Sequence, residues 1–218
     1  MRSFRQRNFA AVIVIGALAA AASAYALWPS EPAGQIGLRA ADPRAGALPI
    51  TFAAPQFSFP DQDDATVSTE MLRGKVTIVD FIFTHCANTC PKMTAKRSEL
   101  QKLIADPRVT FLSISVDPAG DDRATRKSYA TANGIDETRW RFVSPPNRDA
   151  ALKIAQQMKI AAASPHSHEQ SPILHSDRFV LIDGSARVRG AYAITDESAT
   201  SRLVRDANGL AGEIPVAK

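Results

Sequence analysis

Two cysteines, the only ones in the chain, follow an apolar run in the sequence Val76-Thr77-Ile78-Val79-Asp80-Phe81-Ile82-Phe83-Thr84-His85-Cys86-Ala87-Asn88-Thr89-Cys90-Pro91. The β-branched and aromatic residues before the cysteines are typical of a buried strand. The residues after them, from 92 to 104, have the pattern of a helix. The sequence therefore predicts a strand, a turn and a helix, with both thiols at the turn.

The spacing of the two thiols points to chemistry. Residues four apart on a helix lie on one face, so both sulfurs can point the same way. The first turn of a helix has unpaired N–H groups and a positive dipole end, which favour a thiolate. Pro91 suits a first turn because its missing N–H costs nothing there. Two such thiolates can close a disulfide or bind a soft metal ion.

A purely structural disulfide is the simplest alternative. Its loop would be very short, and chain entropy gives such a loop only about 2 kcal/mol, against about 4.7 kcal/mol for a long loop. A bridge that serves stability would normally join distant segments. We therefore expect a functional role for Cys86 and Cys90.

Further elements follow in a regular order. A strand is predicted at 109–116, a helix from Asp121 to about Asn133, a strand at 140–143 and a helix at 150–158. A hairpin of two strands, 174–182 and 187–194, precedes a last helix from Asp196 to about Ala207, with Asn208-Gly209 as its stop. The strand–helix–strand order implies parallel strands first and an antiparallel hairpin last. The fold class is therefore α/β, with a central mixed sheet flanked by helices.

The N-terminus differs from the rest of the chain. The chain has 218 residues and a formal net charge of +4, and Arg2, Arg5 and Arg7 supply three of these charges. The remainder is close to neutral, which gives no electrostatic case for nucleic-acid binding. No charged residue occurs from Phe9 to Leu27, so residues 1–28 are predicted to be a transmembrane anchor or a cleaved signal peptide.

Three regions follow from this pattern. After the N-terminal segment, residues 29–55 are rich in Pro, Gly and Ala and are predicted to be a flexible linker. Residues 56–218 are predicted to form the folded domain. The arginines should stay in the cytoplasm and the domain should lie in the periplasm or another extracytoplasmic space, tethered to the inner membrane by a single pass or secreted after cleavage. Dithiols there tend to oxidise unless they are kept reduced.

The chain resembles a known family. The strand, the CxxxC turn, the βαβ unit and the late hairpin resemble the thioredoxin-like fold. The residues from Phe83 to Pro91 are similar to the signature of the SCO1/SenC family. The runs Leu112–Pro118 and Leu174–Asp177 are similar to later pieces of that family, in the same order. The resemblance covers about Gln56 to Asn208.

This resemblance implies a function. Members of the family are membrane-tethered copper metallochaperones that help assemble the dinuclear copper centre of cytochrome c oxidase. The ligands implied here are Cys86, Cys90 and His175. Soft thiolates prefer Cu(I), and imidazole suits Cu(I) and Cu(II). The implied partners are the copper-centre subunit of the oxidase, other copper chaperones or thiol reductants, and the membrane.

The remaining histidines leave alternatives open. His85 beside the first cysteine is interpreted as a positioning or surface group. His166 and His168 stand in a polar loop and are interpreted as solvated residues, with auxiliary metal capture as the alternative. One of them could complete a four-ligand zinc site with the three implied copper ligands.

Asp80 supports a second hypothesis. A carboxylate in an otherwise apolar strand is costly unless it has a partner, and Lys96 or nearby backbone could supply one. Six residues ahead of Cys86, it resembles the buried aspartate of thioredoxins, which can take a proton from the second thiol. The alternative function is therefore an extracytoplasmic thiol-disulfide oxidoreductase with redox-active Cys86 and Cys90, which reduces cysteines of an oxidase subunit or another partner. Attack would begin at the exposed thiol, expected to be Cys86. Peroxidase activity is a distant third, because Phe83 stands where peroxiredoxins have threonine.

Overall fold

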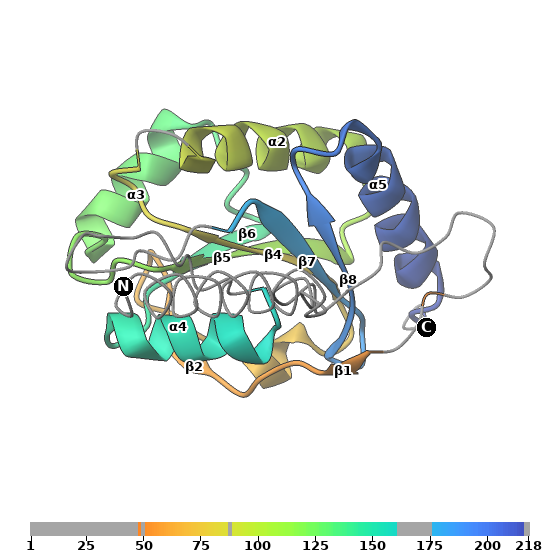
Figure 1. The fold of residues 1–218 in the computed structure, drawn as a ribbon, viewed down its shortest axis with the longest axis horizontal. Coiled ribbons are helices and arrows are strands. Elements are labelled where there is room, and N and C mark those ends of the chain that lie inside the picture. Colours follow the sequence, from red (N-terminus) through yellow and green to blue (C-terminus); the bar gives the residue numbers. More distant parts are fainter. Residues whose placement is uncertain (1–47, 49–50, 87–88, 161–175, 216–218) are drawn as a thin grey trace, which may run out of the picture. The chain divides into compact units, whose positions relative to one another are not determined.

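A mixed sheet of six strands organises the folded unit (Figure 1). The computed structural model describes residues 48, 51–86, 89–160 and 176–215, all within the unit Gly37–Lys218. The strand order is β1-β8-β7-β4-β5-β6. In this part of the chain no helix has the length and apolar character needed to cross a bilayer. The predicted membrane segment at residues 9–27 lies outside the described residues.

The strands divide into a parallel and an antiparallel half. β4 (Val76–Ile82), β5 (Val109–Ser115) and β6 (Trp140–Val143) run parallel. β7 (Arg178–Ile182) and β8 (Arg187–Ala193) form an antiparallel hairpin, and β7 pairs with β4. β1 (Phe52–Ala53) adds to β8 and lies within the range 29–55 that the sequence assigns to a linker. The predicted order of parallel strands followed by a hairpin is confirmed.

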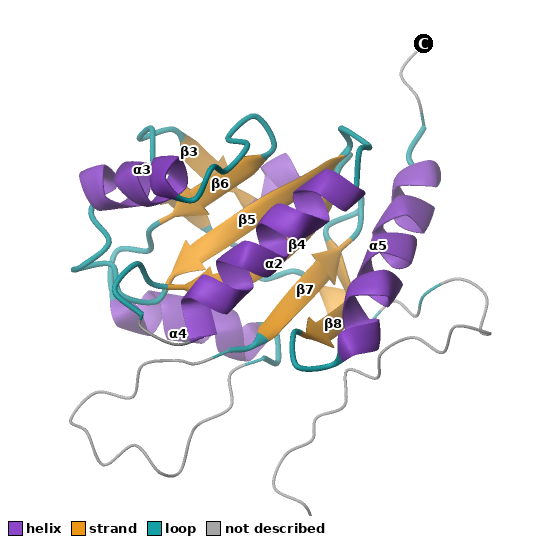
Figure 2. Cartoon of the chain, turned by 90° about the horizontal axis from the view of Figure 1, so that it is seen from above, coloured by secondary structure: helices purple, strands orange, loops and turns teal. Residues whose placement is uncertain are grey.

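Helices cover both faces of the sheet. α2 (Thr89–Leu103) and α5 (Glu197–Gly212) lie on one face, and α4 (Arg148–Gln157) lies on the other (Figures 1 and 2). α3 (Arg123–Ala132) packs beside α2, where the Tyr129 and Thr94 hydroxyls are 2.6 Å apart. A small hairpin of β2 (Ser58–Pro60) and β3 (Thr66–Ser68) and the 3-10 turn η1 (Thr69–Leu72) complete the order.

Local chemistry accounts for these elements. All seven residues of β4 are buried, as expected for a strand with helices on both faces. Each of α3, α4 and α5 is preceded by a capping residue whose side chain accepts a hydrogen bond from a backbone N–H of the first turn. These residues are Asp122, Asn147 and Asp196. These caps satisfy N–H groups that the helix itself leaves free.

Several predicted boundaries differ from the structure by a few residues, and two of them bear on the site and the core. α2 begins at Thr89 rather than at residue 92, which places Cys90 inside the first turn. The predicted stop of the last helix at Asn208-Gly209 is wrong, because α5 continues to Gly212. Leu210 and Ala211 are buried in the core, so their packing outweighs the weak helix propensity of the glycine.

Candidate functional site

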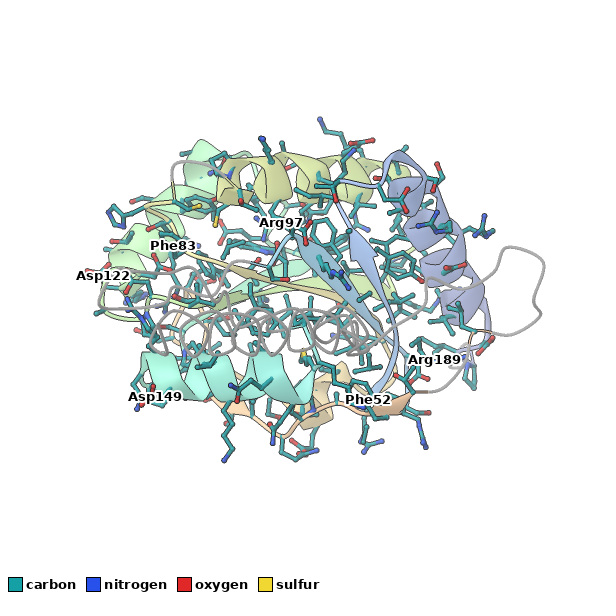
Figure 3. All side chains as sticks on the ribbon, viewed as in Figure 1. Phe52, Phe83, Arg97, Asp122, Asp149 and Arg189 are labelled. Atoms are coloured by element: carbon teal, nitrogen blue, oxygen red, sulfur yellow. The ribbon has the colours of Figure 1, made fainter. Side chains whose placement is uncertain are left out.

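Both cysteines lie where β4 passes into α2. The strand ends at Ile82, and the Cys86 N–H donates to the Phe83 carbonyl at 3.4 Å, which turns the chain toward the helix. Cys90 is the second residue of α2. Figure 3 labels Phe83 at the end of the molecule where α2 starts. Neither cysteine forms a disulfide in the described part of the chain, and both are buried, with 8% of Cys86 and 6% of Cys90 exposed. The exposed fractions do not single out Cys86 as the attacking thiol.

The start of the helix supports the first sulfur. The backbone N–H of Cys90 donates to the Cys86 sulfur at 3.3 Å. This N–H belongs to the first turn, where the helix offers it no carbonyl partner. A hydrogen bond to sulfur at the positive end of a helix stabilises the thiolate form. The predicted relation between the thiols and the helix start is therefore present.

The second sulfur has the opposite environment. Burial raises the pKa of the Cys90 thiol, and the neighbouring Cys86 thiol raises it further, while a hydrogen bond with the Phe83 backbone opposes the change. Cys90 is thus held as a protonated thiol in the metal-free chain. A metal ion that binds here must displace that proton, so binding is coupled to proton release.

A buried aspartate fixes the loop before Cys86. Asp121 is fully buried and accepts hydrogen bonds from the Thr84 backbone N–H at 3.0 Å and the Thr84 hydroxyl at 2.6 Å. Its other oxygen accepts from the Ser115 hydroxyl at 2.6 Å. Asp121 stands between β5 and α3, so these bonds join the cysteine loop to the neighbouring crossover. The sequence showed Asp121 as the start of a helix and did not reveal this role.

Asp80 has a charged partner on α2. The Arg97 guanidinium lies 3.8 Å from the Asp80 carboxylate, and 0% of Arg97 and 1% of Asp80 is exposed. The expectation that Lys96 could be the partner is wrong, because Lys96 pairs with Glu99 at 2.6 Å. Arg97 is seven residues after Cys90, which is two helical turns, and therefore shares its face of α2. That spacing could have identified Arg97 from the sequence.

A serine and a tryptophan complete this buried cluster. Ser113 pairs with Asp80 in the parallel register of β4 and β5, and its hydroxyl donates to Asp80 and accepts from Arg97. The indole N–H of Trp140 also donates to Ser113, at 2.9 Å. Arg97 lies over the Trp140 ring, 4.4 Å from the ring centroid. We call Asp80, Arg97, Ser113 and Trp140 the buried cluster.

The buried cluster is incompletely hydrogen-bonded. Among the described residues, one Asp80 oxygen and two Arg97 nitrogens, Nε and Nη2, are buried without a hydrogen-bond partner. Burial raises the pKa of Asp80, while the Arg97 charge and the Ser113 hydrogen bond oppose this change. Burial also lowers the pKa of Arg97. The cluster therefore holds opposite charges at a cost in solvation that their attraction must offset.

The predicted histidine ligand lies outside the described residues, as do His166 and His168. The described chain resumes at Ser176, which follows His175 directly and is buried. Ser176 precedes β7, which runs antiparallel to β4, so this point lies at the end of the sheet where β4 leads to Cys86. Within the described residues no three His, Cys, Asp or Glu side chains are grouped as a metal site.

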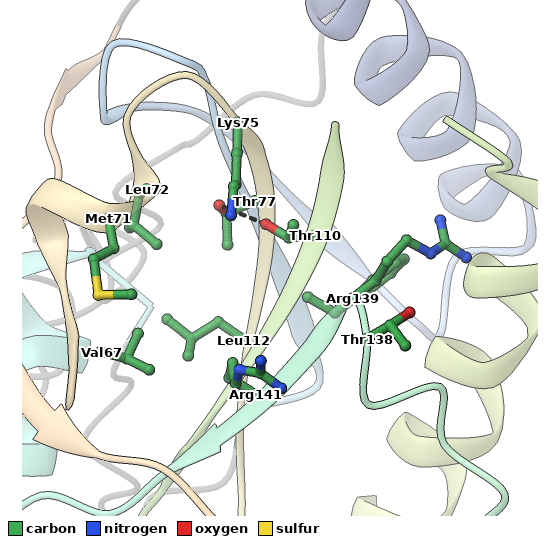
Figure 4. A pocket seen from close by; sticks show the side chains of 11 residues that line it. Val67, Met71, Leu72, Lys75, Thr77, Thr110, Leu112, Thr138, Arg139 and Arg141 are labelled. Atoms are coloured by element: carbon green, nitrogen blue, oxygen red, sulfur yellow. Dashed lines mark hydrogen bonds between the residues drawn. The ribbon is translucent and has the colours of Figure 1, made fainter. Parts of the chain in front are cut away.

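A separate pocket lies away from the cysteines (Figure 4). Its volume is about 140 Å³, and it is lined by residues of β3 and η1, the first halves of β4 and β5, and the segment that leads into β6. Thr77 and Thr110 meet on its wall, with their hydroxyl oxygens 3.2 Å apart. Neither cysteine lines it. It therefore has no part in the thiol site.

Comparison with known proteins places this geometry in a family. A sequence model of the SCO1/SenC family matches residues 49–209. A SCO1/SenC family lipoprotein from Bacillus anthracis shares 28% identity and a TM-score of 0.66, over 73% of this chain and 95% of its own. BsSco, described as a member of the Sco family of cytochrome c oxidase assembly proteins, shares 27% identity and a TM-score of 0.65, over 76% and 98%.

A copper-bound structure shows the same fold. ScoI of Bradyrhizobium japonicum with copper bound shares 23% identity and a TM-score of 0.58, over 72% of this chain and 99% of its own. The family match covers nearly all of the folded unit, including the six-stranded mixed sheet and both cysteines. The chain belongs to the SCO1/SenC family.

Proposed function

We propose that this protein is a copper metallochaperone that delivers copper to the dinuclear copper centre of cytochrome c oxidase. The observation that carries the proposal is the pair of cysteines four residues apart at the start of α2, in a chain of the SCO1/SenC family. ScoI is a family member with copper bound, and BsSco is a family member associated with oxidase assembly. The two relatives support the cargo and the destination respectively.

The residues present suit copper as cargo. Two sulfurs four residues apart are soft donors, which select Cu(I) over harder ions. His175 is the proposed third ligand, and buried Ser176 brings the chain to the correct end of the sheet. Two thiolates and one imidazole leave Cu(I) with few ligands, so an incoming ligand from a partner can displace them one at a time.

We further propose that residues 9–27 tether the domain to the membrane from an extracytoplasmic position. The Bacillus anthracis relative is a lipoprotein. Lipid attachment of that kind needs a cysteine, and the cysteines of this chain are Cys86 and Cys90 alone. The uncharged N-terminal segment would take the place of the lipid.

The test is copper binding by the reduced full chain. We expect one tightly bound Cu(I) per chain, measured by competition with a chromophoric chelator under anaerobic conditions. His175→Ala and the double variant Cys86→Ser/Cys90→Ser should each lose it. Binding that is weak, or that survives His175→Ala unchanged, would refute the ligand set.

The alternative function is a thiol-disulfide oxidoreductase. The buried cluster favours it, because Asp80 has a raised pKa and contributes to the raised pKa of Cys90. A carboxyl of this kind can accept the proton of the second thiol when a disulfide forms. Arg97 opposes this role, since its charge stabilises the carboxylate. A reductase should reduce a model disulfide at a rate that falls in Asp80→Asn and stays unchanged in His175→Ala.

A further inference from the structure

His85, the residue before Cys86, has one ring nitrogen engaged in a hydrogen bond and the other left as a metal-binding lone pair. The Thr84 hydroxyl lies between two groups, the Asp121 carboxylate at 2.6 Å and Nδ1 of His85 at 3.1 Å. A hydroxyl has one hydrogen, and here it is donated to Asp121. The His85 contact is therefore a hydrogen bond in which Nδ1–H donates to the Thr84 oxygen. In the neutral ring this leaves the lone pair on Nε2.

The backbone at Gly120 lies close to the His85 imidazole. A Cβ at Gly120 would lie 3.6 Å from Nδ1 of His85 and 2.6 Å from a carboxylate oxygen of Asp117. The ring thus lies close to the backbone of the loop after β5, at a position where only glycine avoids the carboxylate. Asp117 is itself held by Arg148 at 3.0 Å. Nδ1 is engaged on this side, and His85 as a residue is exposed to solvent.

His85 differs from the two cysteines in its exposure to solvent. The two cysteines are almost fully buried, so a copper ion bound to another molecule has little direct access to them. His85 is the exposed nitrogen donor joined by one peptide bond to Cys86. It does not form a closed group with other metal-binding side chains of the described residues. Its position suits a ligand that coordinates an ion transiently rather than one that belongs to a stable metal site.

We propose that His85 is the transfer ligand of this protein, which accepts copper from a donor and passes it to Cys86. The inference rests on the proposed copper function. In the first step a bond between Cu(I) and a donor ligand breaks and a bond from Cu(I) to Nε2 forms. In the second step the Cys86 sulfur replaces the imidazole and its proton passes to solvent. Copper remains Cu(I) throughout, so no oxidant or reductant is needed. Imidazole is a suitable ligand for such an intermediate.

The experiment compares rate with affinity. Stopped-flow absorbance would follow transfer of Cu(I) from its bicinchoninate complex to the reduced full chain, for wild type and His85→Gln. Glutamine is polar and of similar length but offers copper no imidazole. We expect transfer to slow by about tenfold, equivalent to about 1.4 kcal/mol in the barrier, while the equilibrium affinity stays within about twofold. Free imidazole should restore much of the rate in His85→Ala.

A matched control is Met71→Gln. Met71 is 54% exposed and carries a thioether, another soft copper ligand, but it lies beside the separate pocket. Its loss should leave the transfer rate unchanged. An unchanged rate in His85→Gln, or a loss of affinity equal to the loss of rate, would overturn the proposal. If wild type binds no copper, the proposed function fails and this inference fails with it. If wild type binds copper and His85→Gln takes it up equally fast, the inference alone fails.

Discussion

Replacing Arg97 by methionine should make the stability of this protein depend on pH. The change removes the cation 3.8 Å from Asp80 and leaves a carboxyl that is 1% exposed. Breaking a buried ion pair from one side costs about 3–5 kcal/mol, because the other charge loses its compensation. Methionine is also a long unbranched side chain, and the substitution removes Nε and Nη2, two buried nitrogens that lack a hydrogen-bond partner within the described residues. We therefore expect the lower end, about 3 kcal/mol, at pH 8.

The sign of the pH dependence follows from Asp80. Burial already raises the pKa of its carboxyl above the ordinary 3.8, and Arg97 opposes that rise. Without Arg97 the pKa of the folded state rises further, so the folded state binds a proton that the unfolded state has released. The free energy of unfolding must then increase as pH falls toward the unfolded pKa, by up to about 1.4 kcal/mol per pH unit. Arg97→Met should accordingly recover much of its lost stability at pH 5.

The reverse substitution supplies the contrast. Asp80→Asn leaves the Arg97 guanidinium buried, and arginine does not release its proton in the accessible pH range. Its loss of stability should therefore be nearly the same at pH 5 and pH 8. The double variant Asp80→Asn/Arg97→Met leaves no buried charge and should lie within about 1.5 kcal/mol of wild type.

Urea unfolding from pH 5 to 8 would measure all four proteins under reducing conditions. Fluorescence of Trp140 reports the transition, because this ring is fully buried against Arg97. Equal destabilisation of Arg97→Met at pH 5 and pH 8 would refute the reasoning, since Asp80 would then remain charged without its partner. A double variant as unstable as the sum of the single variants would show that the two groups do not interact.

Three other predictions concern the loop, the second thiol and a helix cap. Asp121→Ala removes the acceptor of the Thr84 and Ser115 hydrogen bonds and should lower the free energy of unfolding in urea by about 3 kcal/mol. The control Asp122→Ala, at the exposed neighbour, removes only a helix cap and should cost about 1 kcal/mol. Equal losses would contradict the role of Asp121 in holding the loop before Cys86. Because burial raises the pKa of Cys90, iodoacetamide should modify this thiol more slowly in the reduced native chain than in urea, both at pH 8. The rate in the native chain should increase as the pH rises above 8. Mass spectrometry of the Cys90 peptide measures both rates. Asn147→Ala should lower stability by about 1 kcal/mol by removing the cap on the Ala150 N–H, and a change below about 0.3 kcal/mol would count against that cap.

Local sequence patterns predicted the elements well, and their packing less well. The strand into Cys86 could be recognised because its residues, apart from Asp80, suit burial on both faces of a sheet. The stop expected at Asn208-Gly209 failed because burial of Leu210 and Ala211 is a tertiary effect that local turn signals do not contain. Reading backbone signals alone gave the correct kind of element and an incorrect end.

The surroundings of the thiols show the same limit. Asp80 attracted attention because a carboxylate is out of place in an apolar strand. Its partner could be chosen between residues 96 and 97 only by noting that Arg97, seven residues after Cys90, shares the helix face of that cysteine. Arg97 lies on the face that carries Cys90, while Lys96 is directed to Glu99. Asp121 was equally hidden, since a helix cap and a buried acceptor have the same sequence signature.

The direction of β7 explains how distant parts of the chain can form one copper site. Because β7 is antiparallel to β4, with Val79 opposite Val180, its first residues lie at the end where β4 leads to Cys86. A parallel strand at the same place would have put Ser176 at the opposite end of the sheet. The late hairpin therefore brings the residue after His175 to the thiol end, as the proposed ligand set requires. In the proposed site, copper would enter at His85, which follows β4, and would then be held by Cys86 and Cys90 and by His175, the residue before Ser176.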